Sequence, residues 1–142
     1  MGKINKGLFT SATMEWTTPP TLFNRLNNIY SFTHDLACTP TNQLCPIGIY
    51  YDSLVVPWHT LPGWLWCNPP YGRTLGIWVK KAHDESLLGA KIVMLIPART
   101  DTSYWHDYIF DKANIEFIRG RLKFSGQGSA PFPSALIRYG II

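Results

Sequence analysis

Two apolar segments that each end at proline constrain the fold most. Residues 64–67 read WLWC and run into Asn-Pro-Pro, and residues 91–97 read KIVMLIP. Neither segment alternates apolar and polar residues, which is typical of strands buried on both faces. Between them, residues 74–88 carry apolar side chains at helical spacing, and Gly89 follows where a helix terminator is expected. The sequence therefore predicts a β-α-β unit with two parallel strands and a right-handed crossover.

Similar patterns predict elements on both sides of this unit. One helix has Thr18 as its N-cap and Pro19 at its first position, and a later helix has Asp101 as its N-cap. The predicted helices cover residues 18–30 and 101–113, and the further predicted strands cover residues 31–38, 47–56, 115–124 and 134–142. The predicted fold is α/β: a single domain with a mostly parallel open sheet and a terminal antiparallel hairpin, preceded by a loose arm over residues 1–13.

Charge and cysteine content narrow the class of protein. Lys+Arg 13 minus Asp+Glu 9 gives a net charge of +4, which fits a polyanionic partner and equally fits a slightly basic protein without one. The three cysteines have no CxxC spacing, so we expect neither a disulfide framework nor a zinc site and assign no metal. No apolar stretch has the length of a membrane span, so we expect a cytoplasmic protein without a membrane partner.

The segment after the first apolar strand carries the strongest functional signal. Asn68-Pro69-Pro70-Tyr71 lies at the carboxyl end of a predicted strand, where open α/β sheets bind ligands. Two consecutive prolines stiffen the chain and remove backbone donors while keeping the carbonyl acceptors. The Asn68 side-chain oxygen and a proline carbonyl can then accept both N–H bonds of an amino group on a flat heterocycle that stacks on Tyr71. The alternative interpretation is an ordinary proline loop.

The Asn68–Tyr71 segment resembles the motif of S-adenosylmethionine-dependent amino methyltransferases that act on adenine in DNA. The chain as a whole is similar to the small phage-type DNA adenine methyltransferase (Dam) family. The similar segments, in order, are MEWTTPPTLFNRL, FTHDLAC, CNPPYG, WVKKA, VMLIPARTDTSYWH, RGRLKF and PFPSALI. The resemblance implies a minimal Rossmann-like class I methyltransferase domain over residues 14–142. It also implies direct attack by the amino nitrogen of a flipped-out adenine on the methyl group, and action in the bacterial host cytoplasm if a phage encodes the protein.

The resemblance assigns roles to individual residues. The base-holding catalytic residues would be Asn68, Pro69, Pro70 and Tyr71, and the residues binding S-adenosylmethionine would be Thr18, Pro19, Asp35, Ala37 and Asp52. Cys38 leaves room for the cofactor beside the backbone. Asp52 would accept from ribose hydroxyls.

Basic residues near the end of the chain are candidates for contact with nucleic acid. Arg119, Arg121 and Lys123 alternate at a spacing of two, so on a strand they would share one face and form a phosphate-binding stripe. A solvated outer face explains the same spacing equally well. Arg99 follows the second proline-ended strand, on the side of the sheet where ligands are expected.

Two other functions stay open at this point. The same motif fits an amino or amide methyltransferase that acts on RNA or on protein glutamine. The segment DLACTPTN contains no glycine where cofactor loops usually have it, so a nucleic-acid-binding remnant without catalysis is also consistent. Because the predicted elements use nearly all 142 residues, we expect sequence specificity to come from short loops such as SGQGSAPFP or from a partner subunit.

Overall fold

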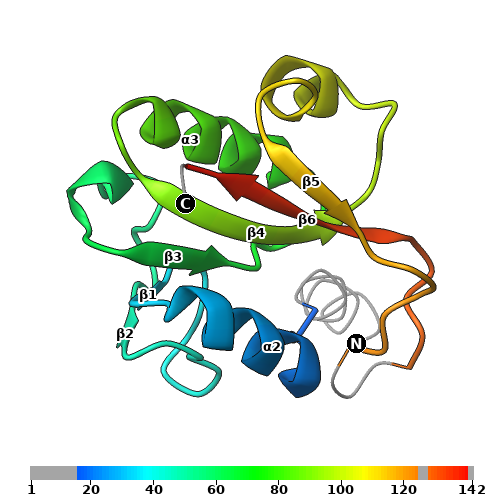
Figure 1. The fold of residues 1–142 in the computed structure, drawn as a ribbon, viewed down its shortest axis with the longest axis horizontal. Coiled ribbons are helices and arrows are strands. Elements are labelled where there is room, and N and C mark those ends of the chain that lie inside the picture. Colours follow the sequence, from blue (N-terminus) through cyan, green and yellow to red (C-terminus); the bar gives the residue numbers. More distant parts are fainter. Residues whose placement is uncertain (1–15, 125–127, 141–142) are drawn as a thin grey trace, which may run out of the picture.

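The computed structural model describes residues 16–124 and 128–140, so the predicted arm over residues 1–13 lies outside the described residues. The described residues form a six-stranded sheet in the order β2-β1-β3-β4-β6-β5 (Figure 1). The strands are β1 (His34–Asp35), β2 (Ile47–Gly48), β3 (Trp64–Cys67), β4 (Lys91–Pro97), β5 (Asn114–Phe117) and β6 (Ser134–Tyr139). β2, β1, β3 and β4 are parallel, and β6 is antiparallel to both β4 and β5. This confirms a mixed α/β fold with a mostly parallel sheet, and it places β6 between β4 and β5.

The predicted β-α-β unit is present at its expected place. β3 pairs with β4 in parallel, with Trp64 opposite Lys91 and Cys67 opposite Met94. Helix α3 (Leu75–Leu87) connects them, and it ends before Gly89, whose φ of +112° few other residues adopt without strain. All residues of β4 from Ile92 to Pro97 are buried, as the uninterrupted apolar pattern predicted.

The helix before β1 starts one residue later than predicted. Helix α2 covers Pro20–Tyr30, with Pro19 as its N-cap, so the assignment of Thr18 as N-cap and Pro19 as first helical residue is wrong. Thr18 is instead buried, and its hydroxyl contacts Asn68. Proline is favoured in the first turn because it lacks the N–H that would have no partner there, and Pro20 takes that place.

Four predicted strands extend further in the sequence pattern than in the structure, and the last of them, predicted over residues 134–142, ends at Tyr139. β1 ends at Asp35, whose carboxylate accepts the Ala37 N–H and redirects the chain. β2 ends at Gly48, and the chain turns at Asp52, whose carbonyl accepts from Val55. β5 ends at Phe117, because a bend follows in which Gly120 has a φ of +75°.

The predicted helix over residues 101–113 is also shorter. Residues 103–109 are helical, and within them Trp105–Ile109 form η2, which has π-helical bonding such as that from the Phe110 N–H to the Trp105 carbonyl. Tyr104 rather than Asp101 precedes it as N-cap, so the capping assignment of Asp101 is wrong. Trp105 is buried in the core, and His106 is exposed.

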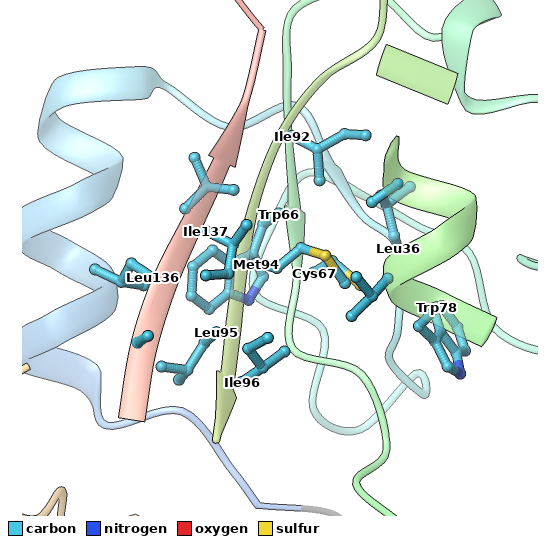
Figure 2. Packing of buried hydrophobic residues seen from close by; sticks show 14 of the residues in the cluster. Leu36, Trp66, Cys67, Trp78, Ile92, Met94, Leu95, Ile96, Leu136 and Ile137 are labelled. Atoms are coloured by element: carbon cyan, nitrogen blue, oxygen red, sulfur yellow. The ribbon is translucent and has the colours of Figure 1, made fainter. Parts of the chain in front are cut away.

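The core lies on both faces of the sheet, under α2 on one side and α3 on the other (Figure 1). Figure 2 shows Met94 and Leu95 of β4 beside Ile137 and Leu136 of β6, which are their partners in the antiparallel register. On the α2 side, Phe23 contacts the ring of Trp66 edge-on at 5.4 Å. On the other side, Trp78, Val79 and Ala82 of α3 are buried, whereas the apolar Ile77 of the same helix is exposed.

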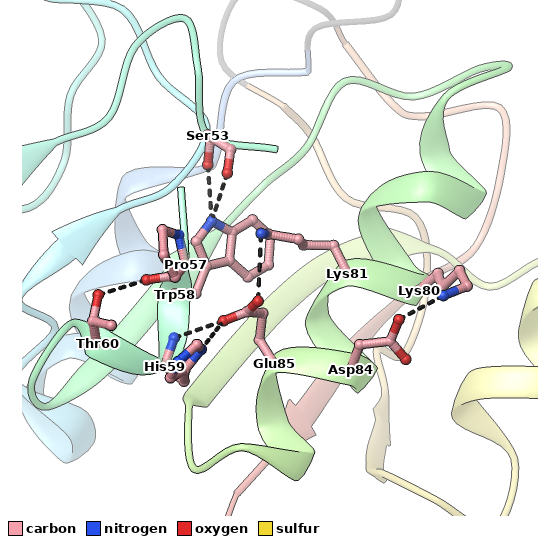
Figure 3. A network of polar contacts seen from close by, with 9 residues as sticks. All are labelled: Ser53, Pro57, Trp58, His59, Thr60, Lys80, Lys81, Asp84 and Glu85. Atoms are coloured by element: carbon pink, nitrogen blue, oxygen red, sulfur yellow. Dashed lines mark hydrogen bonds and ion pairs between the residues drawn. The ribbon is translucent and has the colours of Figure 1, made fainter. Parts of the chain in front are cut away.

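A polar network attaches the segment between β2 and β3 to α3 (Figure 3). Glu85 of α3 accepts from the backbone N–H of His59 at 2.7 Å and lies 3.4 Å from the ammonium of Lys81. The buried Trp58 donates its indole N–H to the Ser53 carbonyl at 2.9 Å, and its ring lies 6.1 Å from that of Trp78. Because Trp78 also lines a cavity at the carboxyl ends of β1 and β3, this network supports one wall of that cavity.

Candidate active site

A cavity of about 340 Å³ opens at the carboxyl ends of β1 and β3. Asp35 is the last residue of β1 and Asn68 directly follows β3, so parallel pairing brings these two distant residues to one edge of the sheet. The lining residues that the sequence predicted are Thr18, Asp35, Ala37, Cys38, Asn68 and Pro70. The lining residues that it missed are Trp16, Thr17, Thr39, Asn42, Leu44, Tyr50, Tyr51, Trp66 and Trp78.

The side-chain amide of Asn68 is held by partners on both sides. Its nitrogen donates to the backbone carbonyl of Trp16 at 2.5 Å and to the Thr18 hydroxyl at 3.0 Å. Its oxygen accepts from the Tyr71 hydroxyl at 3.0 Å. The amide therefore lines the cavity with a fixed orientation, and its acceptor oxygen is already engaged within the protein.

Tyr71 does not present its ring to the cavity, contrary to the expectation that a base would stack on it. The residue is only 3% exposed, and its single hydroxyl hydrogen is shared between the Asn68 side-chain oxygen and the Leu95 carbonyl, each 3.0 Å from the hydroxyl oxygen. Burial raises the pKa of Tyr71 well above its ordinary value, so the hydroxyl stays a donor. In this structure Tyr71 positions Asn68. Pro69 is likewise buried and does not line the cavity.

Tyr71 belongs to an aromatic cluster that the sequence reading missed. The ring centre of Trp16 lies 5.4 Å from that of Phe124 and 5.3 Å from that of Phe132, with both pairs edge-on. The ring centre of Tyr71 lies 6.3 and 5.7 Å from the same two ring centres. Phe124 and Phe132 come from segments more than 50 residues beyond Tyr71, so no local spacing joins them. Trp16, partly exposed, is the member of this aromatic cluster that also reaches the cavity.

Asp35 is a carboxylate in a confined place. It is 2% exposed and accepts from the backbone N–H groups of Ala37 at 3.3 Å and Leu44 at 3.0 Å. Burial raises the pKa of Asp35 from 3.8 to about 6, and the two N–H bonds offset only part of this rise. Asp35 therefore carries a negative charge at neutral pH, at a high cost in solvation, beside the cavity.

Asp35 also explains how the loop after β1 folds without glycine. None of residues 36–44, all of them described, has a positive φ. The loop is closed instead by side-chain acceptors: Asp35 takes two backbone N–H groups, and Asn42 accepts from Thr39 at 2.7 Å. The missing glycine, which motivated the remnant hypothesis, is thus compensated locally.

Two predicted cofactor residues lie outside the cavity. Asp52 is exposed and lies in the turn after β2, and Pro19 is buried and lines a separate surface groove. Tyr50 and Tyr51, by contrast, reach the cavity, because the chain leaves the sheet before them. The sequence pattern could not separate these residues, since it treated all of 47–56 as one strand.

The prediction that three basic residues share one face of a strand is wrong. β5 ends at Phe117, so Arg119, Arg121 and Lys123 all lie in the segment that follows it. Arg121 and Lys123 line the surface groove, and Arg119 does not. Arg99 is exposed, and its guanidinium lies 6.0 Å from the ring centre of Phe132, next to the aromatic cluster.

The three cysteines are buried near the cavity or in the core. Cys38, Cys45 and Cys67 are free and buried. Burial, reinforced by the charge of Asp35, raises the pKa of Cys38 to about 11 and that of Cys45 to about 12.

Among the helices of the described residues, none is long and apolar enough to cross a membrane.

Comparison with known proteins identifies a matching family and a curated relative. The family described as DNA N-6-adenine-methyltransferase (Dam) matches residues 8–134. A curated relative, the DNA N-6-adenine-methyltransferase of Escherichia phage T1, is 28% identical over 109 residues, which are 75% of this chain and 45% of the relative. This chain thus covers less than half the length of that relative. The family match includes every residue that lines the cavity.

Proposed function

Since this chain belongs to the DNA N-6-adenine-methyltransferase (Dam) family, we propose that it transfers a methyl group from S-adenosylmethionine to the exocyclic amino group of adenine in DNA. The observation that carries the proposal is the meeting of Asn68, from the Asn-Pro-Pro-Tyr segment, with Asp35 in one cavity at the ends of two parallel strands. In this proposal residues 14–142 form a reduced, Rossmann-like class I methyltransferase domain that acts on DNA in the bacterial host cytoplasm.

The cavity has the size and the groups that such a cofactor needs. Its volume of about 340 Å³ is within the range of small-molecule sites. Asp35 offers a buried negative charge to a positively charged ligand, and the exposed rings of Tyr50 and Tyr51 offer apolar surface to a purine. Thr18 and Asn42 add hydroxyl and amide groups at the wall. When bound, S-adenosylmethionine supplies an electrophilic methyl group on a positively charged sulfur.

The Asn68 side-chain oxygen and a proline carbonyl of the same segment, in which Pro70 lines the cavity, are the proposed acceptors for the adenine amino group. Two fixed acceptors align the lone pair of the nitrogen, which is catalysis by positioning and electrostatics. In the present structure the outward side of the Asn68 amide is its nitrogen, bound to the Trp16 carbonyl. In this proposal the base replaces Trp16 and the amide turns its oxygen toward the base. The Tyr71 hydroxyl then accepts from the amide nitrogen and donates to the Leu95 carbonyl, which holds the turned amide. Extrusion of the base from a duplex costs a few kcal/mol more.

Methylation assays with three substrates test the proposal. The protein is incubated with labelled S-adenosylmethionine and plasmid DNA, RNA or a protein extract, and the DNA is sequenced for modified adenine. We expect label in DNA, at adenine. Label confined to RNA or protein would replace this function with an amino or amide methyltransferase. Calorimetry with S-adenosylhomocysteine adds an independent readout, because a remnant without a cofactor site would not bind it.

A further inference from the structure

A second hollow on the described surface lies between α2 and the segment after β5. Its lining residues are Pro19, Thr21, Leu22, Arg25, Arg121, Leu122 and Lys123. We call it the basic groove, because its three charged side chains are all cationic. Resting on the function proposed above, we propose that the basic groove binds the DNA backbone phosphates that flank the target adenine.

The position of the basic groove relative to the cavity supports this assignment. On one side, Thr18 lines the cavity and contacts Asn68, and the next residue, Pro19, lines the basic groove. On the other side, Phe124 belongs to the aromatic cluster, and the preceding residue, Lys123, lines the basic groove. A nucleotide whose base reaches Asn68 therefore has cationic side chains beside it, where its sugar and phosphates must lie.

The charges of the basic groove are available to a ligand. Arg25 pairs with Glu116 at 2.9 Å, but both side chains are about half exposed, at 50% and 52%, so solvent screens the pair. Within the described residues, no ion pair joins Arg121 or Lys123 to an acidic side chain. The first turn of α2 has no acidic residue either, and its partial positive charge adds to the local potential.

The segment that carries Arg121 and Lys123 is held in place before any ligand arrives. The Ala130 N–H donates to the Leu122 carbonyl at 2.8 Å, and Lys123 forms an antiparallel bridge with Ser129. Buried Phe124 anchors the end of this segment in the aromatic cluster. Because the backbone is already ordered, phosphate binding costs mainly the side-chain entropy of two long cations.

The test is the salt dependence of DNA binding. The variants Arg121→Gln and Lys123→Gln each remove one charge from the basic groove, and Arg119→Gln removes one charge from the same segment outside it. Arg25 is left unchanged because it also pairs with Glu116. A fluorescent DNA duplex is titrated by anisotropy over a range of KCl concentrations. Each lost phosphate contact should lower the slope of log Kd against log salt by about 0.9 and weaken binding roughly five- to tenfold at ~0.1 M salt.

The control variant and a second ligand make the outcomes distinct. We expect Arg119→Gln to keep the wild-type slope, and all variants to keep wild-type affinity for S-adenosylhomocysteine, which shows an intact cavity. If the wild-type protein methylates DNA but DNA affinity falls equally in Arg119→Gln and in the two groove variants, or falls in none of them, the basic groove is not the phosphate site. If wild-type protein neither binds nor methylates DNA, the proposed function fails together with this inference.

Discussion

The amide nitrogen of Asn68 donates to the backbone carbonyl of Trp16, a residue 52 positions earlier in the chain. A carbonyl only accepts, so this contact decides which end of the amide faces outward. The amide oxygen is left for the Tyr71 hydroxyl. The segment before α2 thereby controls the acceptor on which the proposed chemistry depends.

Replacement of Asn68 by alanine should remove turnover and spare the cofactor. We expect kcat to fall by about 10²–10³, because one of two fixed acceptors for the amino group is lost. The free energy of unfolding should fall by about 1–2 kcal/mol, since the Trp16 carbonyl and the Tyr71 hydroxyl each lose a partner. Single-turnover methylation and calorimetry with S-adenosylhomocysteine measure the two effects separately. Unchanged turnover would show that Asn68 has no part in the reaction.

Tyr71→Phe should reveal whether the hydroxyl positions Asn68. The ring stays between Phe124 and Phe132, but the bonds to Asn68 and Leu95 are lost, so we expect a loss of about 1–2 kcal/mol in urea unfolding. Tyr71→Ala also leaves a cavity and should cost about 3–5 kcal/mol. Turnover should already fall in Tyr71→Phe. A phenylalanine variant with wild-type turnover would mean that the hydroxyl does not orient the amide.

Asp35 should make stability fall as pH rises from about 4 to about 6. Its pKa is raised from 3.8 to about 6 by burial, so in this window the native state binds the proton that the unfolded state has released. A rise of about two pKa units lowers the free energy of unfolding by about 3 kcal/mol across this window, and the decrease is complete above pH 6. Urea unfolding across pH 4–7 measures it. Asp35→Asn should abolish this decrease in stability between pH 4 and pH 6. A variant with the same pH profile as the wild type would contradict the raised pKa of Asp35.

Glu85 should give the opposite dependence at lower pH. It is mostly buried, and burial alone would raise its pKa; the His59 backbone and ring and the ammonium of Lys81 nevertheless hold the pKa below the ordinary 4.5. Its ionised form therefore stabilises the fold above pH 4.5, and this contribution is lost as pH falls through the lowered pKa. We expect the free energy of unfolding of Glu85→Gln to fall less than that of the wild type when the pH is lowered below 4.5.

Asp84→Asn is the matched control for Glu85. Asp84 pairs with Lys80 at 2.6 Å and its pKa is also lowered, chiefly by that hydrogen bond, but both side chains are about half exposed. Solvent screening makes such a pair weak, so the control should change acid unfolding less than Glu85→Gln does. A larger effect at Asp84 would show that burial of Glu85 does not strengthen its contacts.

Local sequence determined the centre of the fold. The apolar runs 64–67 and 91–97 predict buried strands because every second residue of an exposed strand would be polar, and Gly89 and the prolines mark where elements stop. The position of Asn68 at the carboxyl end of β3 follows directly, as does its nearness to the end of β1 in a parallel sheet. The family resemblance included these segments among seven along the chain, and the family match agrees with it.

Tertiary structure alone decided which way the site residues face. Spacing shows that Tyr71 follows Asn68 by three residues, but the buried orientation of its ring depends on Phe124 and Phe132, which arrive from the other end of the chain. The meeting of Trp16 with Asn68, and of Arg25 with Arg121 and Lys123, likewise joins segments about 50 to 100 residues apart. Hydrophobic periodicity reports only which side chains avoid water, whereas direction and partner are set by packing between distant segments.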